Sequence, residues 1–522
     1  MTKRSLRTPA ALAAAALAVV CLAGSPAAQS APLGGFDDLV KQTMKDWHVP
    51  GLAIAVAKDG RIVLERGHGV RQIGKPASVD THTLFAIGST TKAMTAALIG
   101  MLVDEKKIDW DDPVVKHLPW FQLKDPAVTR ELTVRDLLTH RGGLGNADYL
   151  WYGQRNSTDE ILRRARLIEP AYPVRSSFIY QNIMYAAAGA VIEAVGGTPW
   201  AQMIRTRIFE PLGMRDTIAT AATLAAQPNV ASPHDSVNGQ VRAIENMSVD
   251  PVASAGAVWS SVSDMAKWMQ FLLDGGRAGG TGGRRLLSEA TLAELFKPQT
   301  IAPFDMYPTT SVVKPHWMTY ALGWFQQDYR GKAVDFHTGS IDGMIAIHGL
   351  IRDERLGVYV LANLDHAELR HALMYTVFDR YTGGLDRDWS AEFLKLYDGV
   401  KREADEARKK EEAKRVAGTS PSLPLAEYAG AYSDPLHGEV EVTLVNGALR
   451  LRYGPGFVGA LEHWHYDTFL ARWRDRTVPD AFVTFALRPD GSIDRIRMEA
   501  FSPAADFSYD YQDLLLTPAR EK

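Results

Sequence analysis

Residues 85–92 read Phe-Ala-Ile-Gly-Ser-Thr-Thr-Lys, and the apolar segment that follows, residues 93–102, has the composition of a buried helix. Ser89 and Lys92 are three residues apart, so a helix that begins here places both side chains on one face. A serine hydroxyl is a poor nucleophile at neutral pH and needs an adjacent base, which a lysine with a lowered pKa can supply. The spacing alone is weak support, because about one such pair is expected by chance at average residue usage.

A second polar pattern, Tyr180-Gln181-Asn182, stands directly before an apolar segment that begins at Ile183 and is typical of a helix. In an extended segment, residues two apart face the same way, so Tyr180 and Asn182 can project into one cleft. A tyrosinate is a strong base where neighbouring cations lower the pKa of the phenol, and an asparagine can hydrogen-bond a substrate amide. Taken alone, the pattern is explained more simply as a helix cap beside a core aromatic residue.

The third pattern, His337-Thr338-Gly339-Ser340, ends a predicted strand that starts near Ala333. A glycine at a strand edge allows close approach of a ligand, and His337 adds a polar or positive group there. The backbone N–H of Ser340 could pair with that of Ser89 to form an oxyanion hole. By itself, this tetrapeptide is also consistent with an ordinary strand end.

In this order, the three patterns resemble the motifs of the penicillin-recognising serine hydrolases: Ser-x-x-Lys, then Tyr-x-Asn, then Lys-Thr-Gly or His-Thr-Gly. The likeness is to the branch that contains class C β-lactamases, serine D-alanyl-D-alanine carboxypeptidases, D-aminopeptidases and related esterases. It covers about residues 36–370. Two further stretches carry it: Leu-Leu-Thr-His-Arg-Gly-Gly-Leu at 137–144 and Ser-Ser-Val-Ser-Asp-Met at 260–265.

The resemblance implies a two-step hydrolysis through an acyl-enzyme, with no metal or organic cofactor. It makes Ser89 the nucleophile, Lys92 its base partner, and Tyr180 the group that passes the proton to the leaving group and activates the deacylating water. Asn182 would orient the substrate amide, and His337 and Thr338 would face its carboxylate or leaving side. The substrate-contacting residues that follow are Asn182, His337, Thr338, Gly339 and Ser340, the last through its backbone N–H.

The third motif leaves the substrate class open. His337 replaces the lysine of many relatives, and a neutral histidine holds a carboxylate less firmly, which argues against efficient β-lactam hydrolysis. The favoured hypothesis is a peptidase or carboxypeptidase-like enzyme for small D-amino-acid peptides, ahead of a carboxylesterase and then a β-lactamase. The alternative outside enzymes is a catalytically silent protein that binds peptidoglycan fragments.

The remaining sequence predicts two folded units of an α+β protein. Strand signals at both ends of residues 33–395, with helical signals between them, predict a β-lactamase/transpeptidase-like antiparallel sheet with a helical insertion. Residues 396–422 form a predicted helical linker, because 12 of the 15 residues from 401 to 415 are charged. Short alternating strands with Asn-Gly and Asp-Gly turns in residues 423–522 predict a small antiparallel β-barrel, which resembles the lipocalin-like domains appended to some relatives. We hypothesise that this barrel covers the cleft mouth and restricts substrate size.

The composition and the N-terminal residues limit where the protein can be located and what it can bind. The 522 residues carry a net charge of −3, so no broad basic field would hold a nucleic acid. One cysteine, Cys21, excludes a disulfide framework and a thiolate zinc site. Residues 1–30 have a basic start, an apolar run and small residues, which predict a signal peptide and an exported protein, periplasmic or secreted, with no membrane span after cleavage. The sequence leaves the oligomeric state open.

Overall fold

The computed structural model describes residues 32–384, 387–502, 505, 508–509 and 511–519. The predicted signal peptide and Cys21 therefore lie outside the described residues. Among the described residues, no helix is long and apolar enough to cross a membrane.

An eight-stranded antiparallel sheet forms the centre of the larger unit, in the order β2-β1-β14-β13-β12-β11-β10-β9. The early hairpin thus lies beside the late strands, which confirms the predicted sheet assembled from distant segments. The strands are β1 (Gly51–Lys58), β2 (Arg61–Gly69), β9 (Thr300–Ile301), β10 (Met318–Tyr320), β11 (Phe325–Tyr329), β12 (Lys332–Ile341), β13 (Met344–Ile351) and β14 (Leu356–Ala362).

The alternation of side chains along β1 explains how helices cover both faces of the sheet. Leu52, Ile54 and Val56 share one apolar cluster with residues of α1 (Phe36–Asp46) and α14 (Leu369–Thr382). The intervening small residues at 53, 55 and 57, all alanine, face the other way, where α11 (Val262–Leu273) packs against β1 and β14. Period-two alternation therefore assigns large side chains to one face and small ones to the face that a helix approaches closely.

The helical insertion between β2 and β9 carries the first two motifs. Its central helices are α2 (Thr91–Asp104) and α7 (Asn182–Gly196), which pack against each other and are buried over most of their length. Because neither helix has a solvent face of any size, both are nearly continuous apolar runs, with their charged residues, including the buried Lys92, near the helix ends.

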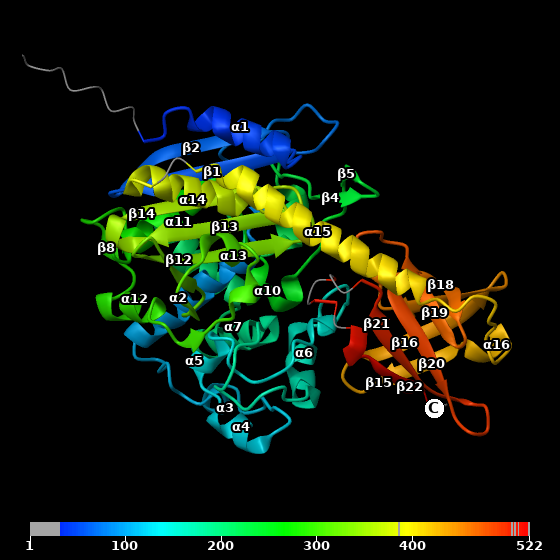
Figure 1. Ribbon diagram of the computed structural model, residues 1–522. Coiled ribbons are helices and arrows are strands. Elements are labelled where there is room, and N and C mark those ends of the chain that lie inside the picture. Colours follow the sequence, from blue (N-terminus) through cyan, green and yellow to red (C-terminus); the bar gives the residue numbers. More distant parts are fainter. Residues whose placement is uncertain (1–31, 385–386, 503–504, 506–507, 510, 520–522) are drawn as a thin grey trace, which may run out of the picture.

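The charged segment is part of a longer helix than the sequence pattern indicated. Helix α15 (Trp389–Ala413) begins with Trp389 and Phe393 buried in the core of the larger unit, and then extends to the barrel (Figure 1). Beyond its end, Arg415 stacks on the ring of Trp464 and donates to its carbonyl oxygen. The linker is therefore attached at both of its ends.

The C-terminal unit is a closed barrel of eight antiparallel strands, β15 to β22, which confirms the predicted barrel. The two hairpins expected from Asn446-Gly447 and Asp490-Gly491 are β16–β17 and β20–β21. The strands are β15 (Gly430–Asp434), β16 (Gly438–Val445), β17 (Ala448–Tyr453), β18 (Phe457–His465), β19 (Thr468–Trp473), β20 (Ala481–Leu487), β21 (Ile493–Ala500) and β22 (Leu515–Pro518).

Candidate active site

The Ser-x-x-Lys motif forms the tight turn that leads into α2. Gly88 has a φ of 51°, which a glycine adopts without strain, and residues Gly88–Thr90 form a 3₁₀ turn before α2 begins at Thr91. The turn brings Lys92 Nζ to 2.8 Å from Ser89 Oγ. The predicted placement of the two side chains on one face is therefore correct.

Three hydrogen-bond partners surround the amine of Lys92. Its Nζ also lies 2.8 Å from Asn182 Oδ1 and 3.0 Å from the carbonyl oxygen of Ala255. Both of these atoms can only accept, so they take two N–H groups of the lysine. An ammonium donates its third N–H to Ser89 Oγ, whereas a neutral amine turns its lone pair there and can take the proton of the serine. The site thus fixes two of the three positions around Nζ and leaves the third for Ser89.

Burial favours the same form of the lysine. The side chain of Lys92 is fully buried, and this lowers its pKa from 10.5 to about 7, against an opposing effect of the Asp148 carboxylate. The rings of Tyr180 and Tyr185 lie 4.8 and 5.2 Å from Nζ. Near neutral pH, a large fraction of Lys92 is therefore uncharged.

Tyr180 is placed next to the nucleophile, but not as the tyrosinate that the sequence suggested. Burial raises its pKa well above 10, and a hydrogen bond with Ser89 only partly opposes this. The expectation of a lowered pKa is wrong because burial is the largest effect on this phenol, and the lysine beside its ring, Lys92, has its own pKa lowered to about 7. A neutral phenol between the serine and the cleft can still accept one proton while it donates another.

Asn182 is the first residue of α7 and is held at both ends of its amide group. Its oxygen accepts from Lys92, and its Nδ2 donates to Asp148 Oδ2 at 3.1 Å. Asp148 is a residue of the site that the sequence analysis missed. It begins a short 3₁₀ turn, Asp148–Leu150, that carries none of the three motifs, and it meets Asn182 only in the folded chain.

The end of β12 faces the nucleophile turn with its backbone. β11 pairs with β12 only as far as Phe336, so residues 337–341 have no strand partner on that side. A Cβ on Gly88 would lie 2.7 Å from the nitrogen of Ser340, and one on Gly339 would lie 3.2 Å from the nitrogen of Ser89. The two amides proposed as an oxyanion hole are therefore brought together.

A buried ion pair supports this strand from behind and was also missed. Arg370 Nη1 donates to the Gly339 carbonyl oxygen at 2.7 Å and to Ser340 Oγ at 3.0 Å, while Glu368 neutralises the guanidinium. The carbonyl of Gly339 and the N–H of Ser340 belong to one planar peptide and point in opposite directions. Arg370 therefore fixes the orientation of the amide that faces Ser89.

His337 lies beside the site as a neutral group, which is the polar of the two alternatives, polar or positive, that the sequence left open. It is 1% exposed, and burial lowers its pKa to about 3. Its Nδ1 donates to the Thr338 carbonyl oxygen at 2.6 Å, so its Nε2 accepts from the Tyr320 hydroxyl at 3.1 Å. Thr338 is partly exposed, and its hydroxyl lies 2.9 Å from that of Tyr307.

We expect Gly339→Ala to remove most of the activity, because the new Cβ would lie 1.9 Å from the Ile87 carbonyl oxygen and would push β12 away from the nucleophile turn. Loss of one oxyanion donor typically lowers kcat by about 100-fold or more. Gly282→Ala is the control, since a Cβ there meets nothing within 4 Å. Steady-state kinetics on both variants, with their melting temperatures, would measure the effect. A Gly339→Ala enzyme with the kcat of the wild type would contradict this account of the site.

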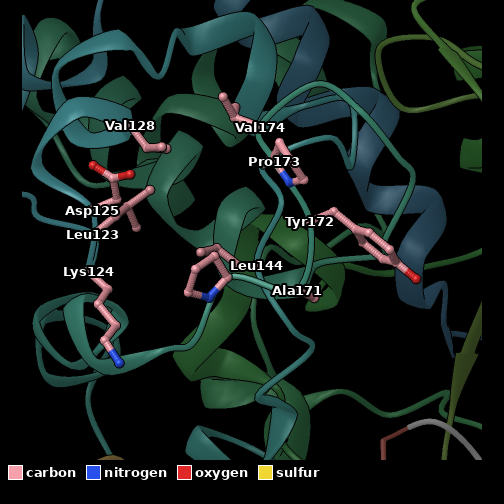
Figure 2. Close-up of a pocket in the computed structure, with 11 residues that line it drawn as sticks. Leu123, Lys124, Asp125, Val128, Leu144, Ala171, Tyr172, Pro173 and Val174 are labelled. Carbon is pink, nitrogen blue, oxygen red and sulfur yellow. The ribbon is translucent and has the colours of Figure 1, made fainter.

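A separate hollow of about 450 Å³ lies between residues 123–128 and the loop 170–174 (Figure 2). Its lining is mostly apolar, and none of the three motifs contributes to it. Across the part of the chain that is described, no group of three or more His, Asp or Glu side chains is arranged to hold a metal ion.

Comparison with known proteins identifies the family of the larger unit. Residues 36–379 match the Beta-lactamase family, and residues 414–518 match a domain of unknown function (DUF3471). Unguisins hydrolase ungD of Aspergillus violaceofuscus (strain CBS 115571) is 30% identical over 513 residues, which cover 90% of this chain and 88% of the relative.

Two solved structures share the fold. The octameric penicillin-binding protein homologue from Pyrococcus abyssi aligns with a TM-score of 0.58 and 21% identity, over 90% of this chain and 98% of the other. SurE with D-Leu aligns with a TM-score of 0.52 and 20% identity, over 94% and 99% of the two chains. The family match over residues 36–379 contains all three motifs, so the chain belongs to the Beta-lactamase family and is a serine hydrolase.

Proposed function

We propose that this serine hydrolase cleaves an amide of a small D-amino-acid peptide through an acyl-enzyme on Ser89. The observation that carries the proposal is the position of Lys92 Nζ, 2.8 Å from Ser89 Oγ with its N–H groups directed to Asn182 and Ala255. This arrangement can remove a proton from the serine hydroxyl as the serine attacks a carbonyl carbon.

The proposed reaction has two steps with a balanced proton path. Ser89 Oγ bonds to the carbonyl carbon, its proton passes to Lys92, and the N–H groups of Ser89 and Ser340 stabilise the oxyanion. The carbon–nitrogen bond then breaks as the proton moves through the Tyr180 hydroxyl to the leaving amine. In the second step, water attacks the ester, gives a proton to the same relay, and releases Ser89 and the carboxylic acid.

The neutral state of His337 supports substrates without a free carboxylate at the end of β12. A histidine whose pKa is about 3 offers no positive charge there at neutral pH. This favours an amide within a peptide, or near its amino end, over the carboxylate of a penicillin or a terminal D-alanine. A relative named as a hydrolase of unguisins supports a hydrolytic reaction, and a protein of the same fold has been solved with D-Leu, a D-amino acid.

The neutral state of His337 also favours a carboxylesterase as the second candidate, because a simple ester lacks a carboxylate next to the scissile bond. The chemistry at Ser89 is identical for the two substrates, so only the leaving group distinguishes them. An ester has a better leaving group and therefore depends less on proton delivery through Tyr180.

A substrate panel would test the proposal: D- and L-configured dipeptide amides, short-chain p-nitrophenyl esters, and a chromogenic cephalosporin. We expect kcat/KM for the D-peptide amides to exceed that for their L-isomers by about tenfold or more, which is the discrimination that one well-placed contact supplies. Ester turnover with no amide turnover would replace the peptidase by the esterase. Rapid turnover of the cephalosporin alone would favour a β-lactamase.

A further inference from the structure

One end of the C-terminal barrel is filled by a segment of the hydrolase unit, residues 148–152. The ring of Tyr149 lies 5.3 Å from that of Phe457 and 5.5 Å from that of Tyr511, both buried aromatic residues of the barrel unit. The Tyr453 hydroxyl donates to the Tyr149 carbonyl oxygen at 3.2 Å. The conformation of this segment is therefore held largely by the barrel.

The segment begins with Asp148, whose carboxylate is directed at the catalytic unit. Asp148 is 1% exposed and accepts from Asn182 Nδ2 at 3.1 Å. It also accepts from Trp151 Nε1 at 2.7 Å and from the hydroxyl of Ser508 at 3.3 Å. Ser508 belongs to the chain between β21 and β22, so the barrel unit reaches this carboxylate directly.

The carboxylate decides which way the amide of Asn182 faces. An amide has a donating and an accepting end that differ little in shape, and its orientation follows from its partners. Asp148 can only accept when ionised, so the NH₂ end turns to it and Oδ1 turns to Lys92. Oδ1 then occupies one N–H of Lys92 and helps to hold Nζ 2.8 Å from Ser89 Oγ, where the neutral form of the amine can take the proton of the serine.

Asp148 is also the charged group that acts on Lys92 against the effect of burial. Its negative charge raises the pKa of Lys92, which burial lowers to about 7. The other titratable groups around Lys92 are two histidines and two tyrosines: His140, His337, Tyr180 and Tyr185. Burial lowers the pKa values of the histidines and raises those of the tyrosines, so all four are neutral near pH 7.

We propose that Asp148 is a positioning residue for the reaction at Ser89, and that the C-terminal barrel completes the active site by holding the segment that carries it. This inference rests on the proposed role of Lys92 as the base. It makes the barrel a part of the catalytic unit, in addition to any effect on substrate size.

Asp148→Asn tests the first half of the proposal. The variant keeps the shape of the side chain but loses the charge, so we expect kcat to fall by about tenfold, as for other residues that orient a reacting group. We also expect the acid limb of kcat/KM to move to lower pH, because the group that raises the pKa of Lys92 is gone. A residue with a purely structural role would lower kcat without moving the limb.

Phe457→Leu and Phe485→Leu test the second half as a matched pair. Both side chains are buried in the barrel, but only Phe457 contacts Tyr149, while Phe485 packs on Tyr428 and Tyr432 within the barrel. We expect Phe457→Leu to lower kcat severalfold and Phe485→Leu to stay within about twofold of wild type, with similar losses of melting temperature.

The outcomes separate this inference from the proposed function. Equal losses of kcat in the two phenylalanine variants, or an Asp148→Asn profile that superimposes on that of the wild type, would overturn it while leaving the role of Ser89 intact. A wild-type protein that forms no acyl adduct with a penicillin and turns over no amide or ester would overturn the proposed function, and this inference with it.

Discussion

Ser89→Ala is expected to abolish acylation and to lower kcat/KM by about 10⁴-fold or more, because the variant lacks the hydroxyl that forms the covalent intermediate. In the wild type, Ser89 Oγ lies 2.8 Å from Lys92 Nζ and is next to the end of β12. An alanine leaves this geometry intact and removes only the attacking atom. The measurement is intact mass during incubation with a penicillin, which adds the mass of the whole molecule to an acylated enzyme.

The control for this experiment is Ser311→Ala, an exposed serine whose hydroxyl donates only to the nearby Pro308 carbonyl oxygen. It should acylate at the rate of the wild type. An adduct that persists in Ser89→Ala would place the nucleophile elsewhere. A lasting adduct on the wild type supports a peptidase, whereas turnover of the penicillin without accumulation supports a β-lactamase.

Lys92→Met is expected to lower kcat/KM by about 10³-fold, within the range that a positioned general base contributes. Methionine has a similar length and no charge, so the substitution tests the base without leaving a new buried cation. The pH dependence of the wild type gives an independent measurement. Because the neutral amine is the reactive form and its pKa is about 7, activity should fall as the pH drops through about 7.

Lys92→Met should lose the fall in activity at low pH along with most of its rate. Lys116→Met, at an exposed lysine paired with Asp112, is the control and should keep both the rate and the profile of the wild type. A wild-type profile that is flat between pH 5 and 9 would show that protonation of Lys92 does not control the reaction, and Tyr180 would then be the next base to test.

The catalytic residues could be predicted from the sequence where the chemistry depends on local spacing. Ser89 and Lys92 lie on one helical turn, and Gly339 marks a strand that another backbone must approach closely, so both requirements are visible in short motifs. Asp148 and Arg370 could not be found in this way, because each acts through a contact with a residue far away in the chain: Asn182 for one and Gly339 for the other.

Burial was the second property that the local sequence did not reveal. The sequence left the charge of His337 open and suggested a lowered pKa for Tyr180. Desolvation is the largest effect on the pKa values of both groups, and the nearby charges add to it: Lys92 and Arg370 also lower the pKa of His337, and Asp148 also raises that of Tyr180. The start of α15 was missed for a related reason. Its charged residues dominate the composition, while Trp389 and Phe393, which attach the helix to the core, are two apolar residues before a long polar stretch.

The pairing of β1 with β14 has a consequence for how the chain folds. Leu52 is aligned with Ala362, so one edge of the early hairpin has no partner until most of the hydrolase unit has been synthesised. Contacts of such long sequence separation carry a large loop-closure cost and make folding slow. The nucleophile turn and the Ser340 amide also belong to segments far apart in the sequence, so they meet only after β12 has been synthesised. A nascent chain that ends before β12 therefore contains the serine and the lysine but has no oxyanion hole.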